Sequence, residues 1–182
     1  MFIQTEETPN PASVKFLPGR VVLTEGTASF ANENEAAGSR LARNLLAVPG
    51  VSSIFFGYDF ITITKSEDAD WPLIKPHVLT VIMDHFVSGL SVMETAQEAH
   101  PAYLDEADPL IRQIRELIET KVRPAVAMDG GDILFDRFEN GVVFLKMQGA
   151  CSGCPSSTAT LKNGIENMLR HYVPEVLEVR AA

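Results

Sequence analysis

The chain has 182 residues, of which 46% are hydrophobic, and its formal net charge at pH 7 is −9. This composition is typical of a globular protein and excludes a disordered chain. No run of Lys and Arg is present to neutralise phosphates, which argues against a nucleic-acid partner. No stretch approaches the roughly 18–20 uninterrupted apolar residues of a membrane span, so we expect no membrane partner either.

The first residues, MFIQTEETPNP, indicate a chain without a targeting segment. They lack the basic and apolar regions of a signal peptide and the Arg- and Ser-rich character of a mitochondrial transit peptide. We therefore expect a cytoplasmic location. A reducing cytosol argues against a permanent disulfide between Cys151 and Cys154, the only cysteines of the chain.

Residues 1–88 predict a first domain that mixes strands and helices. The signals are β-rich runs bounded by turns and apolar residues at helical spacing. Asp70 is expected to be the N-cap of the longest helix, with Pro72 in its first turn. The predicted elements are extended segments at 1–8 and 14–19, a helix within 34–50, a hairpin of strands 51–57 and 60–66, and a helix within 68–89.

Residues 89–108 predict a flexible linker, because this stretch is small, acidic and interrupted by proline. The stretches on either side of it each predict a small unit of strands and helices. We therefore expect an α+β protein, with two small α/β domains joined by a flexible linker.

Residues 109–182 predict a second domain with the element order α-β-β-α-β. Asp108 and Pro109 are residue types that precede and open a helix. Asn140 and Gly141 favour a type I′ turn inside a hairpin. The other predicted elements are the hairpin at 133–149, a helix from Pro155 to just before Pro174, and a strand at 176–181. The apolar face of that helix is expected to consist of Leu161, Ile165, Met168, Leu169 and Tyr172.

The segment GACSGCPSS places Cys151 and Cys154 between a strand and a helix. Pro155 opens the helix, so Cys154 is expected at its N-cap and Cys151 just before it. The unpaired N–H groups and the dipole of the helix favour thiolate over thiol at this position. Metal ligation and redox catalysis both use thiolates, so the position alone does not distinguish them.

The residues leave four interpretations open. A thioredoxin-like thiol-disulfide oxidoreductase also has C-x-x-C at the start of a helix, but within a parallel βαβ pattern. A structural zinc site needs four ligands, and His171 is the one nearby histidine. The two cysteines could also merely precede a helix. Finally, an iron–sulfur cluster takes four thiolates, which two copies of this chain would supply.

The stretch MQGACSGCPSSTATLKNGIENMLRHYVPEV, with VRPAVAMDGGD before it, resembles the NifU C-terminal (Nfu) domain. MFIQTEETPNPASVKFLPG, VSSIFFGYDFITITK and IMDHF resemble the N-terminal domain of mitochondrial and alphaproteobacterial Nfu proteins. The resemblance implies a scaffold or carrier that binds a [4Fe–4S] cluster at a homodimer interface. It implies Cys151 and Cys154 as ligands, upstream cluster-assembly proteins as donors and apo iron–sulfur proteins as clients. Without a transit peptide, we expect a bacterial member.

The motif Asp129-Gly130-Gly131-Asp132 matches the same family. Its residue types predict a tight turn that leads into a strand, and a role beside the cluster is the second hypothesis. No paired-carboxylate, Ser-His-Asp or phosphate-binding glycine pattern is present, so we expect a carrier and not an enzyme. The first domain contains no cysteine, and we expect it to recognise clients or partner proteins.

Overall fold

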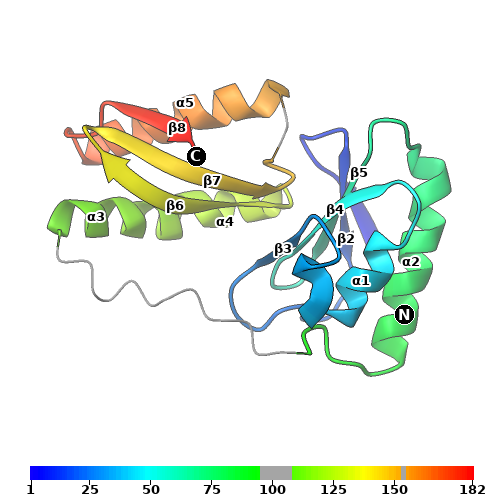
Figure 1. The fold of residues 1–182 in the computed structure, drawn as a ribbon. Helices are drawn as coiled ribbons and strands as arrows, with labels where there is room; N and C mark the ends of the chain where they lie inside the picture. Colours follow the sequence, from blue (N-terminus) through cyan, green and yellow to red (C-terminus); the bar gives the residue numbers. More distant parts are fainter. Residues whose placement is uncertain (95–107, 153–154) are drawn as a thin grey trace.

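The computed structural model describes residues 1–94, 108–152 and 155–182, and these residues contain two β-sheets (Figure 1). The first sheet has the strand order β1-β2-β5-β4-β3, and the second has the order β6-β7-β8. Each sheet packs against helices around a hydrophobic cluster of its own. The predicted α+β class is confirmed. Most of the predicted linker, residues 95–107, lies outside the described residues.

The first sheet is built from antiparallel neighbours throughout. The extended segments and the hairpin predicted from the sequence are all present. The third strand was not predicted, because three residues are too short to show an alternating pattern. The strands are β1 (Gln4–Glu7), β2 (Ser13–Leu17), β3 (Ala28–Phe30), β4 (Val51–Phe56) and β5 (Ile61–Lys65).

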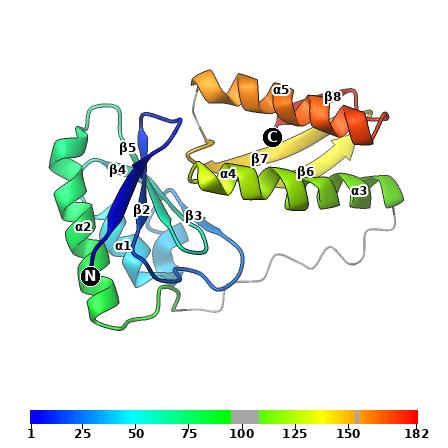
Figure 2. The same ribbon diagram turned by 180° about the vertical axis from the view of Figure 1, so that it is seen from behind.

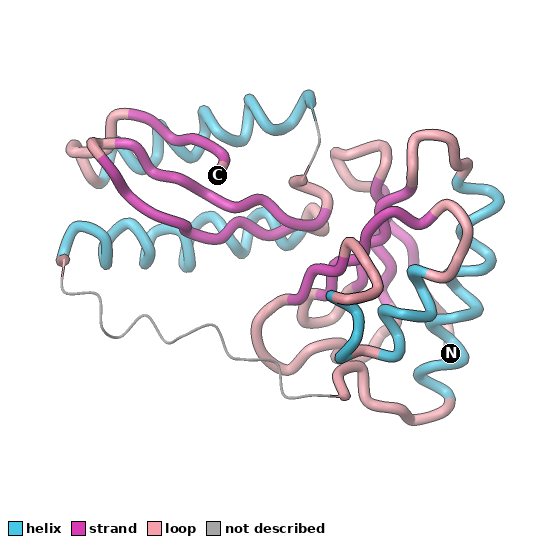
Figure 3. Tube along the Cα trace, viewed as in Figure 1, coloured by secondary structure: helices cyan, strands magenta, loops and turns pink. Residues whose placement is uncertain are grey.

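The helices of the first half are a 3₁₀ turn (Glu35–Gly38), α1 (Arg40–Leu46) and α2 (Trp71–Val87). The predicted helix within 34–50 is therefore divided, because Ser39 adopts an extended conformation and its hydroxyl accepts a hydrogen bond from the Ala42 amide at 3.2 Å. Such a side-chain cap starts a new helix. In Figures 2 and 3, α2 lies on the side of the first sheet that faces away from the second half.

The second half has the predicted order α-β-β-α-β. Asp108 caps the first helix as expected, since its Oδ1 accepts from the Leu110 amide at 2.9 Å. Asn140 and Gly141 have φ values of 50° and 79°, as a type I′ turn requires. The elements are α3 (Pro109–Leu117), a π-helical segment (Ile118–Val122), α4 (Arg123–Met128), β6 (Gly131–Glu139), β7 (Val142–Gly149), α5 (Pro155–Tyr172) and β8 (Glu178–Ala181).

One hydrophobic cluster joins α3, α4, α5 and the second sheet, and Cys151 belongs to it. Ile165 and Leu169 of α5 are buried in this cluster, as the helical spacing predicted. Tyr172 is 46% exposed, so its inclusion in the apolar face was wrong. It is the last residue of the helix, and its ring lies beside the Lys121 ammonium, 5.3 Å from the ring centroid, while the next residue, Val173, is buried in the cluster. No helix in the described ranges combines the length and apolar character that a membrane crossing requires.

A buried histidine in α2 gives the first half a pH-dependent stability. His85 is 4% exposed, and burial, together with the positive charge of Arg40, lowers its pKa from the usual 6.5. The unfolded chain therefore takes up a proton on His85 near pH 6.5, whereas the folded chain does so only at lower pH. We expect the free energy of unfolding to decrease as the pH falls below about 6.5.

Denaturant unfolding at pH 7.5 and at pH 5.5 measures this effect. In His85→Leu the loss of stability between the two pH values should be smaller than in the parent chain. A loss of the same size in both proteins would contradict the assignment to His85.

Candidate functional site

The hairpin of β6 and β7 brings the two glycine-containing motifs of the second half together. Gly131, the first residue of β6, is paired in register with Gly149, the last residue of β7. Beyond this pair, the Ala150 amide donates to the Gly130 carbonyl oxygen at 3.2 Å, and the Ser152 amide donates to the Gly149 carbonyl oxygen at 3.1 Å. The MDGGD turn and the cysteine segment are therefore adjacent at one end of the sheet.

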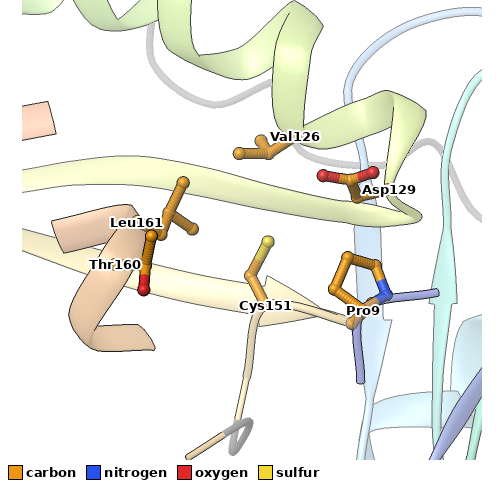
Figure 4. A pocket seen from close by; sticks show the side chains of 7 residues that line it. Pro9, Val126, Asp129, Cys151, Thr160 and Leu161 are labelled. Atoms are coloured by element: carbon orange, nitrogen blue, oxygen red, sulfur yellow. The ribbon is translucent and has the colours of Figure 1, made fainter. Parts of the chain in front are cut away.

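Cys151 lies in the turn that follows β7 and is only 6% exposed. Its sulfur atom is directed into a pocket of about 380 Å³ beside α4 and α5 (Figure 4). The pocket combines one thiol with mostly apolar walls and one carboxylate. Its lining residues are Pro9, Val126, Asp129, Ala150, Cys151, Thr160 and Leu161.

The predicted turn at residues 129–132 is confirmed. Met128 ends α4, and Gly130 has a φ of 78°, a left-handed conformation that commonly follows the end of a helix. Gly131 then opens β6 against the cysteine. A Cβ atom at Gly131 would lie 2.4 Å from the Cys151 Sγ, so glycine leaves the room that the sulfur occupies.

We expect Gly131→Ala to crowd the Cys151 thiol and to reduce the free energy of unfolding by about 1–3 kcal/mol, the usual cost of overpacking. The matched control is Gly164→Ala in α5, where an added Cβ meets nothing within 4 Å. Alanine is favoured over glycine inside a helix, so the free energy of unfolding of the control should increase by up to about 1 kcal/mol. Urea denaturation measures both, and equal stabilities for the two variants would contradict the crowding.

Asp129 and Asp132, the two acids of the turn, have different environments. Asp129 lines the pocket, whereas Asp132 is buried and forms a two-bond ion pair with Arg123. Arg123 Nε donates to Asp132 Oδ1 and Nη2 to Oδ2, each at 2.8 Å. This pair raises the pKa of Arg123, with Glu119 adding to the shift. Asp132 thus fixes the start of β6 to α4.

Of the two predicted ligands, the structure places Cys151 at the pocket, and Cys154 lies outside the described residues. The helix predicted to follow Cys154 does begin at Pro155. In the described ranges, no group of three or more His, Cys, Asp and Glu side chains could hold a metal ion. The described part of one chain therefore offers a single thiol and no complete metal site.

Sequence reasoning missed the contribution of the first half to this region. Pro9 lines the pocket, the Asn10 side chain bonds to the Ser152 carbonyl oxygen, and the Thr62 hydroxyl bonds to the Gly130 carbonyl oxygen. The alternation in FITIT does indicate that Thr62 points away from the apolar face of its strand. It gives no indication of what covers that side.

Two protein families match most of the chain. Residues 3–89 match the family described as "Scaffold protein Nfu/NifU N terminal", and residues 114–180 match the family described as "NifU-like domain". The chain is thus one of the proteins that join an Nfu-type N-terminal domain to a NifU-like domain. It belongs to the Nfu family.

Several similar proteins carry the name "NFU1 iron-sulfur cluster scaffold homolog, mitochondrial". The Drosophila ananassae protein is 55% identical over 181 residues, and the Drosophila sechellia protein is 56% identical over 181 residues. In each case the match covers 98% of this chain but only 63% and 64%, respectively, of the relative. The chain therefore spans less than two thirds of the length of these relatives.

Two solved structures are also similar to this chain. The NMR structure of a NifU-like protein from Saccharomyces cerevisiae is 30% identical, with a TM-score of 0.48, and the match covers 52% of this chain and 86% of that chain. The crystal structure of a Staphylococcus aureus protein is 29% identical, with a TM-score of 0.39, and the match covers 45% of this chain and 99% of that one.

The expected bacterial, cytoplasmic location is wrong. The similar Drosophila proteins are named as mitochondrial. The expectation rested on the first residues of a chain that spans only part of its relatives. The start of such a chain carries no information about a targeting segment.

Proposed function

We propose that this chain carries a [4Fe–4S] cluster as cargo, held by Cys151 and Cys154 from each of two copies, and delivers it to apo iron–sulfur proteins. One observation carries the proposal: the chain has two cysteines in all, spaced C-x-x-C in the segment between β7 and α5. This segment lies inside the NifU-like match, and the similar proteins are named iron–sulfur cluster scaffolds.

The number of ligands supports a dimer. A [4Fe–4S] cluster is held by four thiolates, and one chain has two. A two-fold axis near the cysteine segment would double this number to four. A cluster held between two protomers contacts little protein on either side, which suits release to a client. We therefore propose a homodimer around the cluster, and a carrier rather than an enzyme.

The described residues around Cys151 fit such a cargo. Thiolates are the preferred protein ligands of iron in these clusters. The helix α5 begins at Pro155, three residues after Ser152. The N-terminus of a helix favours negative charge nearby, and therefore thiolates in this segment.

The thioredoxin-like oxidoreductase is the second candidate, because a C-x-x-C segment between a strand and a helix also occurs in that class. Here the preceding strand, β7, forms an antiparallel hairpin with β6 and a parallel pair with β8. β7, α5 and β8 thus form a parallel βαβ unit with the cysteine segment before its helix, so the expectation that this pattern is absent was wrong. The names of the similar proteins, which are iron–sulfur cluster scaffolds, and not the strand arrangement, rank this candidate second. The metal-free protein should show no measurable reduction of insulin disulfides, and a rate comparable to that of a thioredoxin would reverse the ranking.

A transfer experiment tests the carrier function. The protein is loaded anaerobically with iron and sulfide, then mixed with an apo-enzyme whose activity requires a [4Fe–4S] cluster. We expect the enzyme to regain activity faster than with equal amounts of free iron and sulfide, because a preformed cluster is delivered. Recovery at the same rate as with the free ions, from a loaded protein, would contradict the carrier function.

A further inference from the structure

The first half of the chain bonds directly to the backbone of the loops around Cys151. The Thr62 hydroxyl donates to the Gly130 carbonyl oxygen at 2.7 Å, and the Asn10 side-chain amide donates to the Ser152 carbonyl oxygen at 3.3 Å. The Gly130 carbonyl oxygen also accepts from the Ala150 amide, next to the cysteine. Asn10 therefore bonds to the residue after Cys151, and Thr62 bonds to the carbonyl oxygen that also accepts from Ala150, the residue before Cys151.

A row of residues on the outer face of the first sheet continues this contact. Lys15, Thr62 and Phe55 are directly opposite one another on β2, β5 and β4. They are 8%, 0% and 1% exposed, although none of them belongs to the hydrophobic cluster of the first half. The second half covers them. In Figures 1 and 2 the ends of β6 and β7 lie against this sheet in both views.

The contacts of this row fit the loops closely. The Lys15 ammonium donates to the Met128 carbonyl oxygen at 3.2 Å, at the C-terminal end of α4, where a positive charge is favoured. A Cβ atom at Gly149 would lie 3.0 Å from the Phe55 ring, so the ring packs directly on the glycine before the cysteine segment. Both loops that border Cys151 are in contact with the first half.

The Asn10 side chain is itself fixed in place. It is 4% exposed, its Oδ1 accepts from the Ala12 amide at 3.0 Å, and its backbone amide donates to the Thr8 hydroxyl at 3.2 Å. A buried amide held in this way cannot move to water without breaking these bonds. The contact with Ser152 is therefore part of the folded structure.

We propose that the first half is a clamp, in which Thr62 and Asn10 keep the Cys151 loop closed over the pocket, and that cluster binding between two copies requires the clamp to release. This inference rests on the proposed function. In the closed state the Cys151 thiol is buried and directed into the pocket, with Pro9 of the first half in its wall (Figure 4). A thiol in this position cannot reach a cluster shared with a second copy.

The chain is then in equilibrium between a closed state, which does not bind a cluster, and an open state, which does. A ligand that binds only the open state shifts the chain towards it, and a substitution that weakens the closed state has the same effect. Weakening the clamp should therefore expose the Cys151 thiol even when no cluster is present.

The test is the rate at which N-ethylmaleimide modifies Cys151 in the full, metal-free chain, with peptide mass spectrometry to separate Cys151 from Cys154. Thr62→Val removes the hydroxyl that bonds to Gly130. Thr64→Val is the matched control, because Thr64 lies two residues along the same strand and bonds to Ser13 within the first half. We expect about fivefold faster modification in Thr62→Val, as for the loss of one ordinary hydrogen bond. Equal rates in the two variants would overturn the clamp.

Asn10→Asp provides a second test that does not depend on Thr62. The carboxylate can still accept from the Ala12 amide, but it can no longer donate to the Ser152 carbonyl oxygen. Faster modification of Cys151 is again expected, and an unchanged rate in a folded variant would count against the clamp. Far-ultraviolet circular dichroism shows whether each variant is folded.

Loading with iron and sulfide tests the second part of the proposal. Thr62→Val should bind a cluster at least as fast and as fully as Thr64→Val, because a smaller fraction of its chains is in the closed state. Slower or weaker loading in Thr62→Val would show that the contact supports cluster binding instead of opposing it. If no variant or parent binds a cluster, the proposed function fails, whereas the modification rates still decide whether the clamp exists.

Discussion

Serine at either Cys151 or Cys154 is expected to abolish stable cluster binding. After anaerobic loading and desalting, iron should fall from about two atoms per chain, half of a four-iron cluster, to near zero. Removing one cysteine from each of two copies leaves two thiolates for a site that needs four. Iron and sulfide analysis measures the loss. Ser152→Ala is the control, because it changes the same segment while both thiols and the Ser152 carbonyl oxygen remain.

The two cysteine variants should differ in the stability of the metal-free protein. Cys151 is buried in the hydrophobic cluster, so Cys151→Ser places a hydroxyl in an apolar site and should cost about 1–3 kcal/mol of unfolding free energy. Cys151→Ala separates loss of the ligand from this cost, because it introduces no polar group. Full cluster retention in Cys151→Ala or in Cys154→Ser would exclude the replaced residue as a ligand.

The second large effect is expected at the ion pair beside the site. Arg123→Ala leaves the Asp132 carboxylate, whose side chain is 4% exposed, without its charged partner. Breaking a buried ion pair from one side typically costs about 3–5 kcal/mol, and the partial exposure of Arg123 places the expected loss at the lower end of that range. Urea denaturation of the metal-free chain measures the change in unfolding free energy.

The matched control is Arg170→Ala in α5. Arg170 forms an ion pair with Glu166 at 3.3 Å, and its side chain is 51% exposed. Exposed pairs of this type contribute about 0.3–0.5 kcal/mol, so the control should be almost as stable as the parent. If Arg123→Ala is no less stable than Arg170→Ala, the Asp132 pair does not stabilise the start of β6.

The sequence predicted most of the elements because their signals are local. Asp108-Pro109 and Asn140-Gly141 specify a helix start and a tight turn by their own conformational preferences, and both lie where they were expected. The division of the first helix at Ser39 depended on one side-chain bond, which the apolar pattern of residues 34–50 did not reveal. The error at Tyr172 arose because helical spacing predicts a face but not which residue is buried where the helix ends, and here the buried residue is Val173.

The candidate site could be predicted only in part. The spacing of the cysteines and the adjacent helix start pointed to Cys151 and Cys154, and the position of Cys151 in the described structure agrees with a strand-to-helix turn. The contact of Asn10 and Thr62 with the loops is a long-range contact between polar residues, and such residues leave no periodic signal of a partner. The first domain was therefore expected only to recognise other proteins.

Native mass spectrometry of the anaerobically loaded protein decides whether two copies share one cluster. We predict a species with the mass of two chains and one [4Fe–4S] cluster. The metal-free protein should show only the mass of the polypeptide. The same sample analysed for zinc should contain none in stoichiometric amount. A complete [4Fe–4S] cluster on a single chain, or one tightly bound zinc per chain in place of iron and sulfide, would contradict the account.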